Sequence, residues 1–218
     1  MIQYPTFGTM DSFFSSLTLS VLLIHLLAVM SPGPDFIMLV RNALTYSRKI
    51  GIWTAIGFGL GIGIHVLYSV FGLGLIISQS PVIYDGIRYV GSAYLGYIGI
   101  MSIKSSGSTI SVQEVQHKSD ISPLKAIRIG FLTNVLNPKA TLFFLSLFTI
   151  VVGPEASQSL LLSLGILMMI NTTLWFSLLA YLVTHSRILP AFEKYEGVFN
   201  KIFGVLLLGI ALKVAFYP

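Results

Sequence analysis

The sequence has no cysteine and little charge. Of its 218 residues, 10% are Asp, Glu, Lys or Arg and 55% are hydrophobic, and the mean hydropathy is +0.86. Without cysteine, neither a disulfide scaffold nor a thiolate site is possible. Soluble domains carry about 25% charged residues, so this chain lacks the side chains for a water-facing shell, and its hydrophobicity excludes intrinsic disorder. The composition therefore predicts an integral membrane protein.

The excess of basic residues is small and dispersed. The net charge is +5, but Lys and Arg stand singly or in pairs at the edges of hydrophobic runs, which argues against a nucleic-acid partner. Residues 1–12 contain no Lys or Arg, so a secretory signal is not indicated and the first run is expected to be a retained span, with Met10 as an alternative start. No carboxylate and histidine residues cluster within the runs, so we expect no metal and no other cofactor.

Six long apolar runs fill most of the chain. At about 20 residues per helical span, they predict an all-α membrane protein with six transmembrane helices in a single domain, residues 1–218. Because the runs are continuous, they do not fit the alternating strands of a barrel. A loop at 104–125, rich in Ser, Gln and charge, separates two halves at about 12–103 and 126–217. The six runs are 13–40, 50–78, 83–103, 127–152, 158–183 and 199–217.

The positions of Lys and Arg predict the orientation. Ten of the 13 basic residues follow runs one, three and five, whereas Arg88 and Lys213 lie on the opposite side. Cytoplasmic loops are the basic ones, so both termini should face away from the cytoplasm. The ten residues are Arg41, Arg48, Lys49, Lys104, Lys118, Lys125, Arg128, Arg187, Lys194 and Lys201.

The remaining basic residue, Lys139, lies inside the fourth run. It follows Arg128 by eleven residues, which places it about 16 Å deep at ~1.5 Å per helical residue. Asp35 in the first run lies at a similar depth, thirteen residues before Arg48. A charge in lipid costs at least about 3 kcal/mol on insertion scales, so such residues are by default functional candidates.

Both deep charges follow helix-breaking motifs. The first run contains Pro32-Gly33-Pro34-Asp35, and the fourth contains Asn134 and then Asn137-Pro138-Lys139. Proline removes a backbone donor, and glycine admits non-helical torsions. The two Pro-charge pairs coincide after a shift of 104 residues. Since each half has three spans, the halves must be inverted, and paired broken helices in inverted repeats point to a transporter binding site.

This arrangement suits a zwitterionic amino acid. Asp35 can attract the substrate ammonium, while Lys139 and a half-helix N-terminus can bind the carboxylate. Asp35 can also accept a proton and couple export to the proton gradient. Alternatively, Asp35 and Lys139 form a structural ion pair, and Asn134 and Asn137 merely satisfy the broken backbone.

Further candidates lie in the other runs. His65 is a candidate proton relay or a packing histidine, and Asn171 either bonds across helices or lines the cavity. Tyr94 and Tyr97 either line a pocket or anchor the protein at the interface. Small-residue spacing predicts close helix packing at Gly57, Gly61, Gly91, Gly96, Gly204 and Gly209.

The motifs resemble those of the LysE/RhtB family of amino-acid exporters. The similarity rests on Ser31-Pro32-Gly33-Pro34-Asp35, on Arg41-Asn42-Ala43 and on Leu136-Asn137-Pro138-Lys139-Ala140, and it extends from about Ser12 onward. It implies a non-enzymatic exporter of threonine, homoserine, lysine or related amino acids in a bacterial inner membrane. It also implies use of the proton gradient and a homodimer.

Together these features predict a secondary active exporter that works by alternating access around two broken helices. The alternatives are a channel, or an exporter of another small solute or ion. Opposite charges fit a channel poorly, since channels favour rings of like charge. A membrane-embedded enzyme would need a nucleophile with a base or a metal set, and the runs contain neither.

Overall fold

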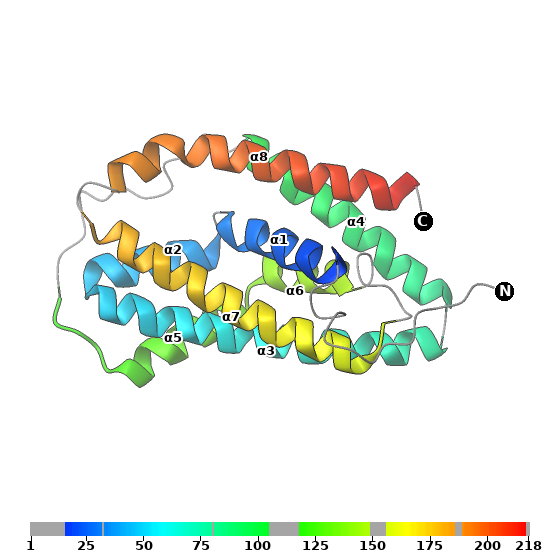
Figure 1. Ribbon diagram of the computed structural model, residues 1–218, viewed down its shortest axis with the longest axis horizontal. Coiled ribbons are helices and arrows are strands. Elements are labelled where there is room, and N and C mark those ends of the chain that lie inside the picture. The colour runs from blue at the N-terminus through cyan, green and yellow to red at the C-terminus, as the bar shows by residue number, and fades with distance from the viewer. Residues whose placement is uncertain are drawn as a thin grey trace.

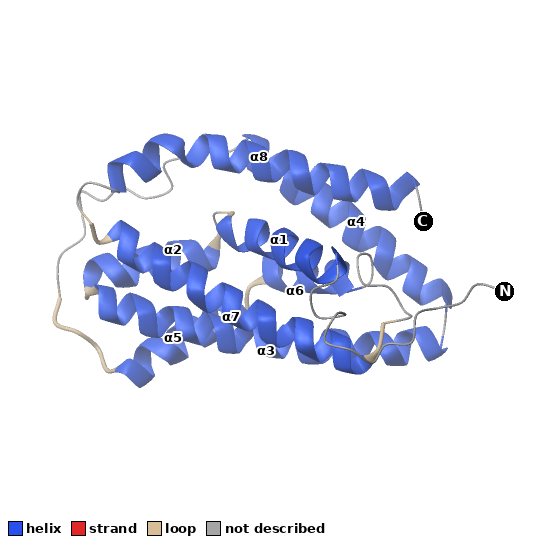
Figure 2. Cartoon of the chain, in the orientation of Figure 1, coloured by secondary structure: helices blue, strands red, loops and turns tan. Residues whose placement is uncertain are grey.

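The computed structural model describes residues 16–31, 33–79, 81–104, 118–148, 156–185 and 189–216. Within these residues all regular elements are helical and there is no strand, so the predicted all-α class is confirmed (Figures 1 and 2). The helices are α1 (Ser16–Met30), α2 (Pro34–Thr45), α3 (Arg48–Gln79), α4 (Pro81–Lys104), α5 (Pro123–Val135), α6 (Pro138–Ser146), α7 (Gln158–Val183) and α8 (Leu189–Phe216).

The first helix break lies at the first proline motif. α1 ends at Met30 and α2 begins at Pro34, and their axes differ by 60°. Gly33 caps α2 with extended backbone, and Pro34 takes the first helical position, where its missing N–H costs nothing. Pro32 lies outside the described residues.

The second break lies between α5 and α6. α5 ends at Val135, and Pro138 again takes the first position of the next helix. Asn137 caps α6, because its side-chain oxygen accepts a hydrogen bond from the backbone N–H of Lys139 at 2.9 Å. Such a cap satisfies one of the donors that a new helix leaves free. The Asn-Pro-Lys sequence thus ends one helix and starts another.

The long helix α3 organises one side of the molecule and packs extensively against α5 and α7, while α4 packs along α8 (Figure 1). Glycine sets the α3–α5 distance: a Cβ on Gly57 would overlap the carbonyl oxygen of Ile127, and one on Gly61 would lie 2.6 Å from Asn134 Oδ1. These two glycines lie in tight helix contacts.

The α4–α8 crossing brings together Gly204, a predicted packing glycine, and Gly99, which was not predicted. A Cβ on Gly99 would lie 2.8 Å from the carbonyl oxygen of Gly204. Gly91 packs instead against Ser146 of α6, whereas a Cβ on Gly96 would make ordinary contact with Ala211 at 3.7 Å. No described atom lies within 4 Å of a Cβ built on Gly209. Of these four predicted packing glycines, Gly91 and Gly204 therefore lie in tight contacts, Gly96 lies in an ordinary one, and Gly209 has no described atom near it.

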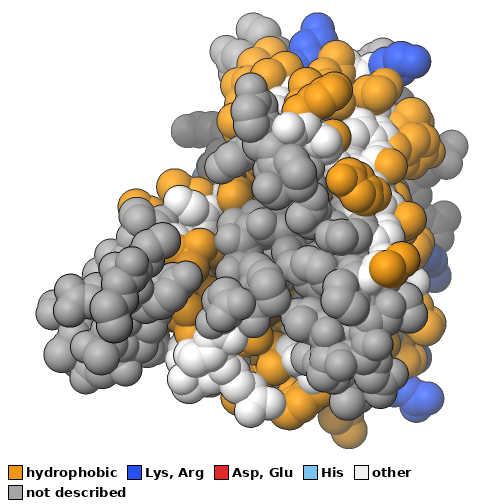
Figure 3. Space-filling model, turned by 90° about the vertical axis from the view of Figure 1, so that its right-hand side faces the viewer, with side chains coloured by type: hydrophobic (Ala, Val, Ile, Leu, Met, Phe, Trp, Pro, Cys, Tyr) orange, Lys and Arg blue, Asp and Glu red, His pale blue; other side chains and the backbone are white. Residues whose placement is uncertain are grey.

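The outer surface is apolar in the way a lipid-facing surface must be. On α7, five large aliphatic side chains spaced four residues apart are 36–65% exposed, and such a continuous apolar stripe would be a liability in water. The face in Figure 3 likewise shows mostly hydrophobic and uncharged described side chains, with basic ones at its rim. The stripe consists of Leu162, Ile166, Ile170, Leu174 and Leu178.

Among the residues that the structure describes, two helical segments are long and apolar enough to cross a membrane, Arg48–Gly72 and Gln158–Val183. The bent pair formed by α1 and α2 is a third candidate span if it is counted as one.

Three connections meet at one end of the molecule, on the left in Figure 1. Ser47 Oγ donates to Asp120 Oδ2 at 2.8 Å, and the Lys118 N–H donates to the Thr45 carbonyl at 2.7 Å. Arg48 Nε donates to Thr184 Oγ1 at 3.0 Å. The segments that carry many of the basic residues therefore lie together.

Candidate functional site

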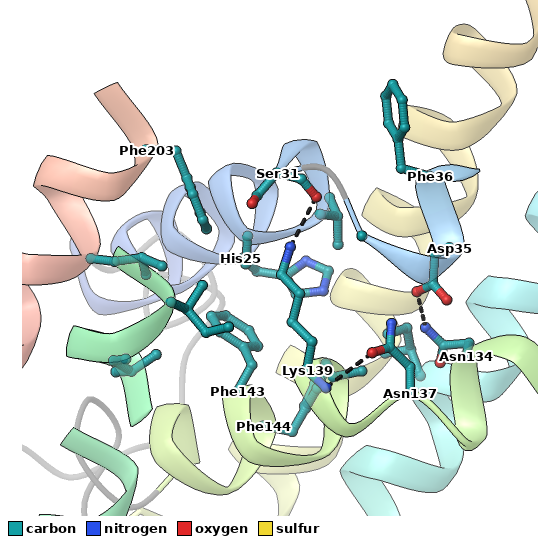
Figure 4. A pocket seen from close by; sticks show the side chains of 18 of the residues that line it. His25, Ser31, Asp35, Phe36, Asn134, Asn137, Lys139, Phe143, Phe144 and Phe203 are labelled. Carbon is teal, nitrogen blue, oxygen red and sulfur yellow. Dashed lines mark hydrogen bonds between the residues drawn. The ribbon is translucent and has the colours of Figure 1, made fainter. Parts of the chain in front are cut away.

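A cavity of about 50 Å³ lies where the two helix breaks face each other. A water needs roughly 10–15 Å³ by this measure, so the cavity has room for a small group of atoms. It lies where two apolar clusters of the interior meet. Figure 4 shows side chains from several helices converging on it. Its polar lining residues are His25, Ser31, Asp35, Tyr94, Asn134, Asn137 and Lys139.

The acid of the site comes from the start of α2. Asp35 is the second residue of that helix, next to its N-terminus, where an anion is favoured. Asn134, at the end of α5, donates from Nδ2 to Asp35 Oδ2 at 2.8 Å. The other carboxylate oxygen, Oδ1, is buried and has no hydrogen-bond partner among the described residues. Buried polar atoms are almost always hydrogen-bonded, so Oδ1 indicates where a further group can bind.

The base of the site comes from the start of α6. Lys139 Nζ donates to the backbone carbonyl oxygen of Ser31 at 2.9 Å (Figure 4). The lysine side chain runs past Gly33, where a Cβ would lie 3.5 Å from Nζ. Nζ also lies 5.6 Å from the ring centroid of Phe203, within cation–π range.

The two breaks are thus tied to each other crosswise. Lys139 of the second break donates to the Ser31 carbonyl of the first, and Asn134 of the second break donates to Asp35 of the first. The residues predicted from the two proline motifs therefore lie together: Gly33, Asp35, Asn134, Asn137 and Lys139 all line the cavity. Pro34 and Pro138 start the half-helices and do not line it.

His65 and Asn171 lie outside the cavity wall. His65 is buried on α3, and its ring atoms contact Tyr68 Oη and the backbone oxygen of Asn134. Asn171 Nδ2 donates to the carbonyl oxygen of Leu22 at 3.2 Å, which joins α7 to α1. Asn171 was predicted either to bond across helices or to line the cavity, and in the structure it makes the bond across helices.

The aromatic wall was not predicted. Phe rings from α2, α6, α7 and α8 surround the polar groups, and His25 of α1 stands among them. His25 is fully buried; Nε2 lies 3.4 Å from Thr172 Oγ1, while Nδ1 has no partner among the described residues. Tyr94, which the sequence predicted either to line a pocket or to anchor the protein at the interface, lines the cavity. The aromatic lining residues are Phe36, Phe143, Phe144, Phe176 and Phe203.

The described residues contain no group of three or more His, Cys, Asp or Glu that could hold a metal ion. The chemistry available in the cavity is that of one carboxylic acid, one amine, an imidazole, two amides, two hydroxyls and aromatic faces. Groups of these kinds can bind and orient a small polar molecule.

Apolar outer helix faces around a small internal cavity that contains an acid and a base define a helical membrane protein with a polar internal cavity. The chain belongs to the LysE type translocators, a family that matches residues 26–217, so the resemblance seen in the proline motifs is confirmed. Membership makes it a membrane transporter rather than an enzyme.

Individual relatives cover nearly the whole chain. The chain is 30% identical over 193 residues to the uncharacterized membrane protein YrhP of Bacillus subtilis (strain 168), which covers 85% of this chain and 91% of that protein. It is 29% identical over 201 residues to the threonine efflux protein of Escherichia coli (strain K12), with coverage of 90% and 96%. For the threonine efflux protein of Salmonella typhi the identity is 27% over 198 residues, with coverage of 88% and 94%. No solved structure matches the chain. The family and these relatives support amino-acid export at the level of the family.

Proposed function

We propose that this protein is a secondary active exporter of small zwitterionic amino acids in a bacterial inner membrane, with threonine as the first candidate substrate. The observation that carries the proposal is the cavity between the two breaks, where the acid has an unpartnered oxygen and the base stands nearby. An amino acid carries an ammonium and a carboxylate on one carbon atom. A site with one buried acid and one buried base complements both groups.

In the bound state, Asp35 Oδ1 accepts hydrogen bonds from the substrate ammonium. Lys139 Nζ donates to the Ser31 carbonyl, and as the cation of the cavity it attracts the substrate carboxylate. The N-terminus of α6 beside Lys139 favours the same anion. The aromatic wall then faces the substrate side chain, which favours a short or apolar side chain over a charged one.

We further propose six spans in two inverted repeats: α1 with α2, α3 and α4, then α5 with α6, α7 and α8. A shift of 104 residues places Pro34 on Pro138, the starts of α2 and α6, and Gln79 on Val183, the ends of α3 and α7. The second spans of the two halves, α3 and α7, pack together, as do the third spans, α4 and α8. This pairing supports a two-fold relation between the halves.

The two hydrogen bonds between the breaks support alternating access. Each joins one half to the other, so a movement of one half against the other must break or rearrange them. Substrate binding at the same two side chains, Asp35 and Lys139, alters their strength. Proton entry drives export against the substrate gradient. The basic end of the molecule faces the cytoplasm, which leaves both termini outside.

An efflux screen tests the proposal. Cells that overexpress the protein are loaded with each amino acid in turn, and its appearance outside is measured. We expect export of threonine or a close relative. We expect Asp35→Asn and Lys139→Met to abolish it while still inserting in the membrane. The exposed residues Asp120 and Lys125 provide matched controls, and Asp120→Asn and Lys125→Met should export normally. Full efflux by both site variants would refute direct roles for the two charges.

A further inference from the structure

His65 lies at the junction of three helices. It belongs to α3 and is completely buried. Nε2 is 3.0 Å from the backbone oxygen of Asn134 at the end of α5, and Nδ1 is 2.6 Å from Tyr68 Oη. Tyr68 Oη lies in turn 3.3 Å from the backbone oxygen of Thr141 in the first turn of α6. His65 and Tyr68 therefore contact both sides of the second helix break.

The donors and acceptors in this chain fix where the hydrogens lie. A carbonyl oxygen only accepts, so Nε2 of His65 carries a hydrogen in either charge state. When the ring is neutral, Nδ1 has no hydrogen and accepts the single O–H of Tyr68. That hydrogen is then not available to Thr141.

Protonation of His65 reverses the short bond. With a hydrogen on both ring nitrogens, Nδ1–H donates to Tyr68 Oη, and the tyrosine O–H turns to the Thr141 carbonyl. One proton is taken up, no covalent bond other than the new N–H forms, and α3 gains a hydrogen bond to α6. The charge on His65 thereby determines whether Tyr68 donates a hydrogen bond to α6, the half-helix that carries Lys139.

We propose that His65 is the proton-binding residue of the transport cycle and that Tyr68 passes its charge state to α6. The inference rests on the proposed export function, and it assigns the coupling proton to a residue outside the substrate cavity. Asn134 connects the two sites, because its backbone oxygen accepts from His65 while its side chain donates to Asp35.

The surroundings of His65 suit a charge that comes and goes. The ring stacks on Phe144, with centroids 5.5 Å apart and planes at 14°, and an aromatic face at this distance stabilises a cation. The titratable groups that the contacts place beside the ring are Tyr68 of α3 and, across Phe144, His25 of α1. Asp35 of α2 is joined to the ring through Asn134, and α6 carries Lys139. α5 has Lys125 and Arg128 in the turns before Asn134, and α7 has no Asp, Glu, Lys, Arg or His. Asp35 is thus the acid that hydrogen bonds link to the new charge.

Transport in proteoliposomes tests the assignment. The full chain is reconstituted in vesicles loaded with radiolabelled threonine, and efflux is measured with and without a pH gradient, alongside threonine exchange at equal pH. His65→Gln keeps an N–H for the Asn134 carbonyl but takes no proton, and Tyr68→Phe keeps the ring but not the hydroxyl. We expect both variants to retain exchange and to lose about tenfold or more of the acceleration by the gradient, in the range of typical coupling between sites.

Matched variants separate coupling from general damage. His185 lies just beyond α7, and Tyr97 is exposed on α4, so His185→Gln and Tyr97→Phe should respond to the gradient as the parent protein does. Undiminished acceleration in His65→Gln would overturn the proposal and leave Asp35 as the proton acceptor. Loss of exchange together with acceleration, in a variant that still folds, would make His65 a structural residue and would equally overturn it.

A second readout does not depend on threonine transport. In protein labelled with ¹⁵N-histidine, the signals missing from the His65→Gln spectrum belong to His65. We expect Nε2 to be protonated throughout, and Nδ1 to gain a proton as the pH is lowered over the range in which the protein stays folded. A His65 that stays neutral over this range would refute the proton site. Failure of threonine to move while His65 titrates would instead count against the proposed substrate.

Discussion

Replacement of Asp35 by asparagine should weaken substrate binding while the protein still folds. The new amide has the same size, and its carbonyl oxygen can still accept the hydrogen bond that Asn134 donates at 2.8 Å. What disappears is the charge that faces the substrate ammonium. A hydrogen bond to a charged group contributes about 1.5–3 kcal/mol. At ~1.4 kcal/mol per factor of ten, threonine should bind about 10- to 100-fold more weakly.

Two threonine derivatives make the prediction specific to one end of the substrate. N-acetylthreonine has no ammonium, so Asp35→Asn should not weaken its binding and, by removing a nearby negative charge, should if anything strengthen it. Threonine methyl ester has no carboxylate, so Lys139→Met should not weaken its binding. Affinities are measured by calorimetry on purified protein in lipid nanodiscs.

The result that would refute this reasoning is equal loss of affinity for threonine and N-acetylthreonine in Asp35→Asn. Such a loss would mean that the carboxylate maintains the cavity and does not contact the ammonium. The exposed variant Asp120→Asn serves as the control and should leave both affinities unchanged.

Two further predictions concern the fold and its orientation. Gly57→Ala should destabilise the protein by about 1–3 kcal/mol, the usual cost of overpacking, because the new Cβ would overlap the Ile127 carbonyl oxygen. Gly209→Ala, where no described atom lies within 4 Å of the new Cβ, should leave the stability unchanged. Thermal unfolding in detergent compares the two variants, and equal stability would contradict the tight α3–α5 contact. Because the chain has no cysteine, single cysteines introduced as Lys118→Cys and Val82→Cys can be labelled individually. An impermeant maleimide should modify Val82→Cys in intact cells and Lys118→Cys only in inverted vesicles. The opposite pattern would reverse the proposed orientation.

The helix breaks could be predicted from sequence because they are local effects. Pro34 and Pro138 lack a backbone donor and suit the first helical position, and Asn137 caps the helix that starts beside it. Such effects depend on adjacent residues alone. The sequence thus located both helix breaks that border the cavity.

The partners within the site could not be predicted, because they come from segments about one hundred residues apart. The sequence suggested that Asp35 and Lys139 neutralise each other or that the asparagines serve the backbone. In the structure Asn137 does serve the backbone as the cap of α6, but Asn134 donates to Asp35, and Lys139 donates to the Ser31 carbonyl. In particular, no sequence pattern showed that a backbone oxygen freed by one break would accept from the lysine of the other.

The aromatic wall escaped for a different reason. In a membrane protein, phenylalanine is common on lipid-facing and inward-facing surfaces alike, so hydropathy does not distinguish Phe203, which is buried at the cavity, from Phe216, which is exposed. The α4–α8 contact shows the same limit: glycines at 96, 99, 204 and 209 look alike in the sequence, and only the crossing point of the helices selects Gly99 and Gly204.

The most direct test of the central claim is an experimental structure of the protein with threonine bound. The account predicts threonine in the cavity between the two breaks, with its ammonium within hydrogen-bond distance of Asp35 Oδ1 and its carboxylate within hydrogen-bond distance of Lys139 Nζ. Threonine bound elsewhere, or bound in this cavity with neither contact, would contradict it.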